Sequence, residues 1–328
     1  MRPDVEHQPK PALIESLTSL WRSVLHRPSI GLEDNFFALG GGPSQAAELF
    51  SEIARTFGSD ISPLTIYHAP TIAALAAILE NSSPFRLPPL IPLRAGTEGP
   101  PVFITHGLGA TVMDFFGLVQ RIETRRPIYG MQARGTDGAE EPLRRIEDMA
   151  GYFLNAIREV QPHGPYILVG YSLGGLVTLE MAQRLLANGE EIALLALLEA
   201  YPHRSYLPFG SRVRLHARLL MHHLSNATRG KIRRRPSIRA TLSPAMQRVH
   251  DSSYLALTRY RPRPYPGKVQ FVRAAVSIDF PDDPRAAWAG WIGDMEVETV
   301  AGDHQEIITT HFKELAAVLS RYLGAVRS

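Results

Sequence analysis

Residues 170–174 have the sequence G-Y-S-L-G, which contains a residue suited to nucleophilic chemistry, Ser172. A short apolar run over residues 166–169 precedes this motif, and an apolar helical pattern over residues 176–186 follows it. In such a strand–turn–helix setting the glycines permit a sharp turn, and the serine is exposed at its tip beside the helix N-terminus. We therefore predict that Ser172 is a nucleophile; the alternative is a glycine-rich turn with an inert serine.

A serine hydroxyl needs a base to accept its proton, and histidine is the usual base near neutral pH. In hydrolases with a serine on such a turn, the chain order is serine, acid, histidine. His304 follows the last predicted strand, residues 297–300, and precedes the last predicted helix, residues 312–323. It therefore stands where this order requires the base.

Glu199 is the favoured acid. It directly follows the apolar strand predicted over residues 193–198, so its carboxylate is expected at the same edge of the sheet as the serine. Asp279 and Asp282 follow the next predicted strand and remain alternatives, whereas Asp303 is adjacent to the histidine and is not expected to orient its ring. The acid would stabilise the imidazolium that forms when the serine loses its proton.

An oxyanion that forms on a carbonyl needs two fixed N–H donors. The backbone amide of Leu173 is one candidate, because this residue follows the nucleophile at the start of the helix. The loop over residues 106–110 is expected to supply the other through the amide of Leu108. We expect His106 in the same loop to be structural.

Residues 89–328 resemble the thioesterase domains that end non-ribosomal peptide synthetases and polyketide synthases, which have the α/β-hydrolase fold. The resemblance rests on segments 103–109, 170–175, 197–199, 260–267 and 302–304. It implies cleavage of a thioester and a helical lid formed by an insertion at about residues 203–262. The family usually has aspartate where Glu199 stands, and this difference keeps the alternative acids open.

Residues 12–80 resemble a peptidyl or acyl carrier domain. The resemblance rests on segments 33–41, 57–58 and 69–75. In that family a serine two residues after a Gly-Gly pair carries phosphopantetheine, but here Pro43 occupies that position and Ser44 follows it. One residue along a helix turns a side chain by about 100°, which would misdirect the Ser44 hydroxyl. Two hypotheses stay open: phosphopantetheine on Ser44, or an unmodified docking or structural module.

The chain is predicted to divide into four parts: a disordered start (1–10), a carrier-like all-α helical bundle (11–81), a linker (82–98) and a thioesterase domain (99–328). The bundle is predicted from apolar residues at three- and four-residue spacing. From residue 102 onward, short apolar strands alternate with helices. Such alternation indicates a parallel sheet covered by helices on both faces.

The composition narrows the possible functions. With 45% apolar and 20% charged residues and a net charge of +3, the chain has the profile of a soluble protein. It has no cysteine, which excludes disulfides, thiolate metal sites and a cysteine nucleophile. The N-terminus lacks the apolar stretch of a signal peptide, and the longest apolar run, residues 192–198, is too short to span a bilayer. We expect a cytoplasmic protein without membrane association, metal or nucleotide cofactor.

The insertion is rich in basic residues: Arg212, Arg214, Arg218, Arg229, Lys231, Arg233, Arg234 and Arg235. Such a cluster fits an acidic partner, such as a carrier surface or its phosphodiester arm, and it also fits a solvated helix face. Nothing besides this charge supports nucleic-acid binding, which we do not expect.

The function predicted from the sequence is release of an acyl or peptidyl chain from a carrier-bound phosphopantetheine thioester, by hydrolysis or cyclisation. The partners would be upstream synthetase modules or a separate carrier protein. Two rivals remain. An esterase or acyltransferase of the same fold would pass the acyl group from a carrier or a soluble donor to another acceptor, and a non-catalytic docking protein would keep both folds without the activity.

Overall fold

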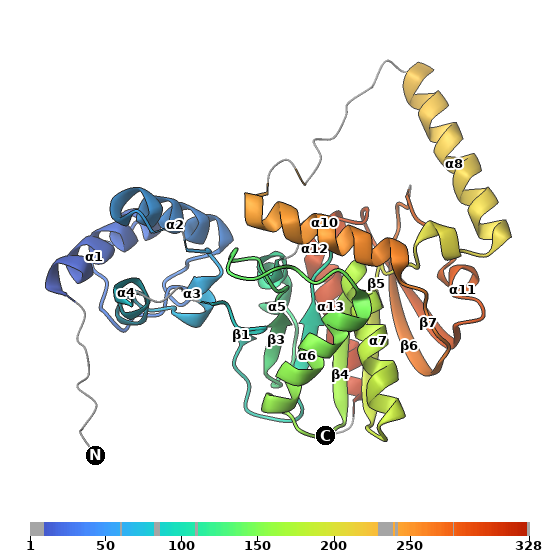
Figure 1. Ribbon diagram of the computed structural model, residues 1–328, viewed down its shortest axis with the longest axis horizontal. Helices are drawn as coiled ribbons and strands as arrows, with labels where there is room; N and C mark the ends of the chain where they lie inside the picture. Colours follow the sequence, from blue (N-terminus) through green and yellow to red (C-terminus); the bar gives the residue numbers. More distant parts are fainter. Residues whose placement is uncertain are drawn as a thin grey trace. The chain divides into compact units, whose positions relative to one another are not determined.

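The computed structural model (Figure 1) describes residues 10–59, 61–81, 86–108, 111–228, 239, 242–277 and 279–326, and for residues 222–228 it describes the backbone alone. The chain forms two compact units, Met1–Pro88 and Pro89–Ser328, called here the N-terminal unit and the C-terminal unit. Apart from Lys10, the start predicted to be disordered lies outside the described residues.

The N-terminal unit is a small helical bundle, as the sequence predicts. Its helices are α1 (Pro11–Leu25), α2 (Pro43–Phe57), α3 (Thr65–His68) and α4 (Ile72–Glu80). The spacing of apolar residues gives α1 and α2 one apolar face each, and these faces contribute to a core that includes Trp21, Phe36 and Ile53. The rings of Trp21 and Phe36 pack edge to face with their centroids 5.2 Å apart.

The C-terminal unit is built on a sheet that, within the described residues, has seven strands in the order β1-β3-β2-β4-β5-β6-β7. β1 is antiparallel to β3, and the other neighbouring strands are parallel. The strands are β1 (Leu90–Arg94), β2 (Val102–Thr105), β3 (Ile128–Met131), β4 (Tyr166–Tyr171), β5 (Ile192–Leu198), β6 (Tyr265–Ala274) and β7 (Ile292–Val300). β4 is buried along its whole length, as expected for a central strand covered on both faces.

Helices cover both faces of this sheet, which confirms the predicted layered architecture. In Figure 1, α6 and α7 lie on one face and α5 and α13 on the other. The helices are η1 (Val112–Phe115), α5 (Phe116–Val119), α6 (Ile146–Val160), α7 (Leu173–Ala187), α11 (Pro284–Ala287), α12 (Glu306–Thr309) and α13 (Phe312–Ala325). Within the described ranges, no helix is long and apolar enough to cross a membrane.

The carboxyl ends of β4, β5 and β6 lie next to one another at one edge of the sheet. Tyr171 at the end of β4 pairs with Leu198 at the end of β5, and Leu198 pairs in turn with Val272 in β6. The pairing continues one residue further, since the N–H of Ser172 donates to the Leu198 carbonyl and the N–H of Glu199 to the Val272 carbonyl, both at 2.8 Å. The sheet register therefore places the ends of these strands side by side.

The insertion between β5 and β6 is helical, as predicted for residues 203–262. Its described elements are η2 (Arg204–Tyr206), α8 (Phe209–Thr228) and α10 (Pro244–Arg259). After α10 the chain returns beside α7, where Glu180, 2% exposed, accepts hydrogen bonds from Tyr260 Oη at 3.1 Å and Arg263 Nη2 at 3.0 Å. A buried carboxylate needs such partners, so this cluster fixes the end of the insertion. The following basic residues lie outside the described ranges: Arg229, Lys231, Arg233, Arg234 and Arg235.

Part of the predicted linker, residues 82–98, is a strand instead. Residues 82–85 lie outside the described ranges, but β1 pairs with β3 from Leu90 opposite Met131 to Arg94 opposite Ile128. β1 is an edge strand, which is where a sheet tolerates a proline such as Pro92. The prolines of this segment led to the linker prediction, and the described part of the segment adds a strand to the edge of the sheet.

Candidate active site

Ser172 lies at the sharp turn between β4 and α7. Its backbone has φ 55° and ψ −121°, a conformation that L-residues rarely adopt. A Cβ on Gly170 would lie 2.4 Å from Thr178 Oγ1, and a Cβ on Gly174 would lie 2.5 Å from the carbonyl oxygen of Thr105. Both flanking positions of the motif therefore require glycine, as the sequence analysis predicts.

His304 lies in the loop between β7 and α12, and its imidazole reaches both predicted partners. Its Nε2 is 3.1 Å from Ser172 Oγ, and its Nδ1 is 3.3 Å from Glu199 Oε2. The side chain of His304 is 27% exposed, whereas that of Glu199 is 1% exposed. The three predicted residues thus form one hydrogen-bonded row that is open to solvent at the serine–histidine end.

Glu199 is held by the backbone as well as by the histidine. Its backbone φ is 49°, and its Oε1 accepts a hydrogen bond from the Ala274 N–H at 2.7 Å. One carboxylate oxygen is therefore bound to the sheet, and the other faces the imidazole. The longer side chain of glutamate still reaches His304 from the position where the family usually has aspartate.

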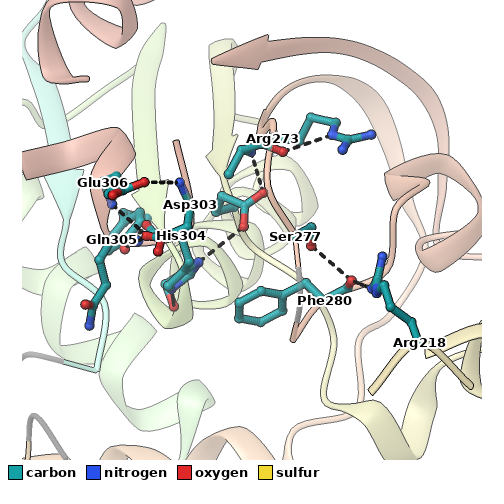
Figure 2. A network of polar contacts seen from close by, with 12 residues as sticks. Arg218, Arg273, Ser277, Phe280, Asp303, His304, Gln305 and Glu306 are labelled. Carbon is teal, nitrogen blue, oxygen red and sulfur yellow. Dashed lines mark hydrogen bonds and ion pairs between the residues drawn. The ribbon is translucent and has the colours of Figure 1, made fainter. Parts of the chain in front are cut away.

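Asp282, one of the two alternative acids, and Asp303, which was not expected to be the acid, both have other partners. Asp282 forms an ion pair with Arg218 of α8. Asp303 Oδ1 accepts hydrogen bonds from the backbone N–H groups of Gln305 and Glu306, at 3.0 and 3.1 Å (Figure 2). Asp279 lies on the same loop as Asp282, after β6. Of the carboxylates considered, the structure brings Glu199 to the imidazole and directs Asp282 to Arg218.

The predicted oxyanion loop passes directly against Ser172, since a Cβ on Gly107 would lie 3.0 Å from Ser172 Cβ. His106 holds this loop by both ring nitrogens. Its Nε2 accepts from the Ala133 N–H at 3.1 Å, so the ring proton is on Nδ1 and is donated to the Gly107 carbonyl at 2.7 Å. The C=O and N–H of one trans peptide point in opposite directions, so this bond turns the Leu108 N–H away from His106.

Two aromatic side chains that were not among the predicted site residues lie against the His304 imidazole. The Tyr171 ring is stacked with that of His304 at 5.0 Å between centroids, and its hydroxyl donates to the His304 carbonyl at 2.6 Å. The Phe280 ring lies 4.6 Å from the imidazole (Figure 2). Tyr171 is within the motif itself, whereas Phe280 lies in an irregular loop without periodicity.

A mostly apolar pocket adjoins the predicted oxyanion loop at His106. It lies among α6, α7, α10 and the segment after β3, and its lining includes Leu143, Met149, Tyr152, Leu173, Val177 and Val249. Within the described residues, no group of three or more His, Asp or Glu side chains could hold a metal ion.

In the N-terminal unit, Ser44 is the second residue of α2 and is exposed. Gly42 is the N-cap with an extended backbone, and Pro43 is the first helical residue, as the sequence predicts. The Ser44 hydroxyl therefore lies at an accessible helix N-terminus, one residue beyond the position at which the family carries its serine.

Two family models match the chain. The model of the thioesterase domain matches residues 100–323, and the model of the phosphopantetheine attachment site matches residues 15–79. The chain belongs to the thioesterase domain family. The resemblance to a carrier–thioesterase pair and the predicted enzyme class, thioesterase, are confirmed.

The relatives of this thioesterase among curated proteins include long synthetases. A dimodular nonribosomal peptide synthase of Bacillus subtilis (strain 168) is 44% identical over 195 residues, which are 59% of this chain and 8% of that protein. Enterobactin synthase component F of Escherichia coli O157:H7 is 27% identical over 280 residues, 84% of this chain and 22% of that protein. The chain thus spans a small part of each of these relatives.

Solved structures share the fold of the thioesterase. The type II thioesterase BorB from the borrelidin biosynthetic cluster has a TM-score of 0.55 at 20% identity and covers 71% of this chain and 97% of its own. The four-domain nonribosomal peptide synthetase holo-AB3403 has a TM-score of 0.60 at 20% identity, over 98% of this chain and 27% of its own. The α/β-hydrolase fold class predicted from the sequence is confirmed.

Acidification should destabilise the C-terminal unit through His106. Burial lowers the pKa of this histidine from 6.5 to about 4 in the folded chain, so the ring stays neutral there while the unfolded chain binds a proton. Its contribution to the free energy of unfolding is complete above pH 6.5 and is lost as the pH falls toward 4, by up to about 3 kcal/mol. Denaturant unfolding across this pH range measures the effect. His106→Asn should remove this part of the pH dependence. If the free energy of unfolding of this variant falls with pH as steeply as that of wild type, His106 is not the cause.

Proposed function

We propose that this thioesterase releases an acyl or peptidyl chain from a carrier-bound phosphopantetheine thioester through an acyl-enzyme on Ser172. The observation that carries the proposal is the hydrogen-bonded row of Ser172, His304 and Glu199 at the carboxyl edge of the sheet. The family models for a thioesterase domain and for a phosphopantetheine attachment site support the substrate class.

In the first step, His304 Nε2 accepts the proton of Ser172 Oγ while Oγ attacks the thioester carbonyl carbon. The N–H groups of Leu173 and Leu108 are the proposed donors to the oxyanion. When the tetrahedral intermediate collapses, the C–S bond breaks and the imidazolium returns its proton to the sulfur. The products are an ester on Ser172 and the free thiol of the carrier arm.

In the second step, a water molecule attacks the ester, and His304 again accepts and returns the proton. An amine or hydroxyl of the acyl chain can take the place of water, in which case the product is a ring rather than a free acid. The apolar pocket beside Leu173 supports a substrate with apolar groups.

Glu199 acts through the histidine in both steps. When the imidazole becomes positive, the buried carboxylate opposite Nδ1 stabilises that charge and holds the ring in the tautomer that can accept a proton at Nε2. Low exposure strengthens this interaction, because little water screens it.

The N-terminal unit is the proposed carrier of the phosphopantetheine arm, with Ser44 as its attachment residue. Ser44 is exposed and lies beside the position at which the family carries its serine. If the arm is attached there, the substrate arrives on the same chain; otherwise upstream synthetase modules or a separate carrier protein must deliver it.

Ser172→Ala should lower kcat on acyl-N-acetylcysteamine thioesters by roughly 10⁴-fold or more, because the acyl-enzyme cannot form. Thiol release measures the rate, and product analysis distinguishes a free acid or a ring from transfer to an added acceptor. A fluorophosphonate should label wild-type protein at Ser172. The control variant Ser205→Ala, which changes an exposed serine, should be labelled like wild type. If folded wild-type protein is not labelled, the result favours a docking function over an enzyme.

Glu199→Gln should lower kcat by roughly 10³ to 10⁴-fold, because the imidazolium loses the opposing charge and the ring loses its tautomer preference. Asp279→Asn and Asp282→Asn should each keep at least roughly tenfold more activity than Glu199→Gln. Steady-state kinetics on one thioester compares the three variants. If Glu199→Gln turns over normally while Asp282→Asn does not, the acid is Asp282.

Incubation with coenzyme A and a promiscuous phosphopantetheinyl transferase should add one arm to the wild-type chain, and Ser44→Ala should abolish the addition. Pro43→Ser places a hydroxyl at the family position, so this variant should be modified faster than wild type. Intact-mass spectrometry over time gives both rates. If the mass of the wild-type chain stays constant while Pro43→Ser gains the arm, the N-terminal unit of the natural chain is an unmodified module.

A further inference from the structure

The loop between β6 and α11 presents Phe280 to the catalytic imidazole. The Phe280 ring lies 4.6 Å from that of His304 at an interplanar angle of 35°, and Tyr201 stacks on Phe280 at 5.2 Å and 16°. Tyr201 is buried and follows Glu199 by two residues. A continuous set of aromatic contacts therefore connects the segment after β5 to the imidazole through Phe280.

The backbone of this loop is held from two directions. The Phe280 carbonyl accepts from Ser277 Oγ at 3.0 Å and also from Arg218 Nη2 (Figure 2). Arg218 Nη1 pairs with Asp282. On the other side, Arg273 Nη1 donates to the Asp282 carbonyl at 2.7 Å. Arg218 is thus the residue of α8 that reaches both Phe280 and Asp282.

We propose that Phe280 and Arg218 are positioning residues for the reaction: Phe280 fixes the orientation of the His304 ring, and Arg218 of the helical insertion fixes Phe280. The inference rests on the proposed function, because it assumes that His304 is the base for Ser172. Through these two residues the insertion influences the position of the His304 ring, in addition to any contact that the insertion makes with substrate.

The physical reason is that the His304 ring must keep two hydrogen bonds at once. The contact with Ser172, at 3.1 Å, is at the long end of the normal range, and the contact with Glu199, at 3.3 Å, is slightly beyond it. A small rotation of the ring would therefore break one of them. An aromatic ring packed against the imidazole opposes that rotation. The electron-rich face of Phe280 also favours the imidazolium formed during the reaction.

Arg218 matters because the loop has no regular structure of its own over residues 275–283, apart from the undescribed residue 278. The guanidinium provides two fixed donors, one for the Phe280 carbonyl and one for Asp282. Burial lowers the pKa of Arg218, but an arginine stays charged at neutral pH. The contact between Arg218 and the loop therefore persists at neutral pH. It depends on the position of α8, which carries Arg218.

The experiment is a double-mutant cycle with Phe280→Ala and Arg218→Met. Each single variant should lower kcat, and the rate of fluorophosphonate labelling of Ser172, by about tenfold or more, because a misplaced base accepts the proton poorly. KM should change much less. In the Phe280→Ala background, Arg218→Met should have less than a twofold further effect, because Arg218 acts through Phe280.

Arg214→Met is the matched control, since Arg214 is an exposed residue of the same helix and its substitution removes the same charge. It should leave kcat and the labelling rate at the wild-type values. Phe280→Tyr keeps the aromatic ring and should restore most of the rate lost in Phe280→Ala. Thermal unfolding of every variant shows whether it is folded at the assay temperature.

The inference is overturned if the two rate losses multiply in the double variant, if Arg214→Met loses as much as Arg218→Met, or if folded Phe280→Ala is labelled at the wild-type rate. Failure of the proposed function has a different signature. In that case wild-type Ser172 itself is not labelled, whatever the variants do.

Discussion

The imidazole of His304 makes two hydrogen bonds in opposite directions, and these depend on the strands that position its two partners. The ring is rigid, so the serine and the carboxylate must be held at fixed points on either side of it. β4 and β5 provide these points because they are paired parallel neighbours that end together, with Tyr171 opposite Leu198. The register of the sheet, continued by one backbone hydrogen bond beyond each strand, therefore sets the spacing of the site.

This arrangement has a conformational cost. Ser172 and Glu199 both have a positive φ, at 55° and 49°, and such strain costs on the order of 1–3 kcal/mol at each residue. In this conformation both side chains reach His304. The two backbone hydrogen bonds to Leu198 and Val272 help to offset it, as does the burial of β4 and β5 on both faces.

The sequence was sufficient to predict the residues that directly follow a clear strand. Ser172 and Glu199 have this position, and His304 stands between the last strand and the last helices, so their proximity follows from the topology of a parallel sheet. Phe280 could not be predicted because its loop has no periodicity. Arg218 is one of many arginines in the insertion, and nothing in the sequence distinguishes it. The edge strand β1 was missed for a similar reason: its proline and those around it are typical of a linker.

The partners of Asp282 favour the proposed acid, the glutamate after β5, over an aspartate after β6. If Asp282 were the acid, the Arg218 guanidinium would compete with the imidazolium for its charge and weaken the stabilisation of His304. Glu199 has no such competitor among its described contacts, because its second oxygen is bound by a neutral backbone N–H. Within the described contacts, no positively charged side chain competes with the histidine for this carboxylate, which lies in surroundings with little water. The two carboxylates thus have separate partners, and the insertion can be held to the loop after β6 without neutralising the proposed acid.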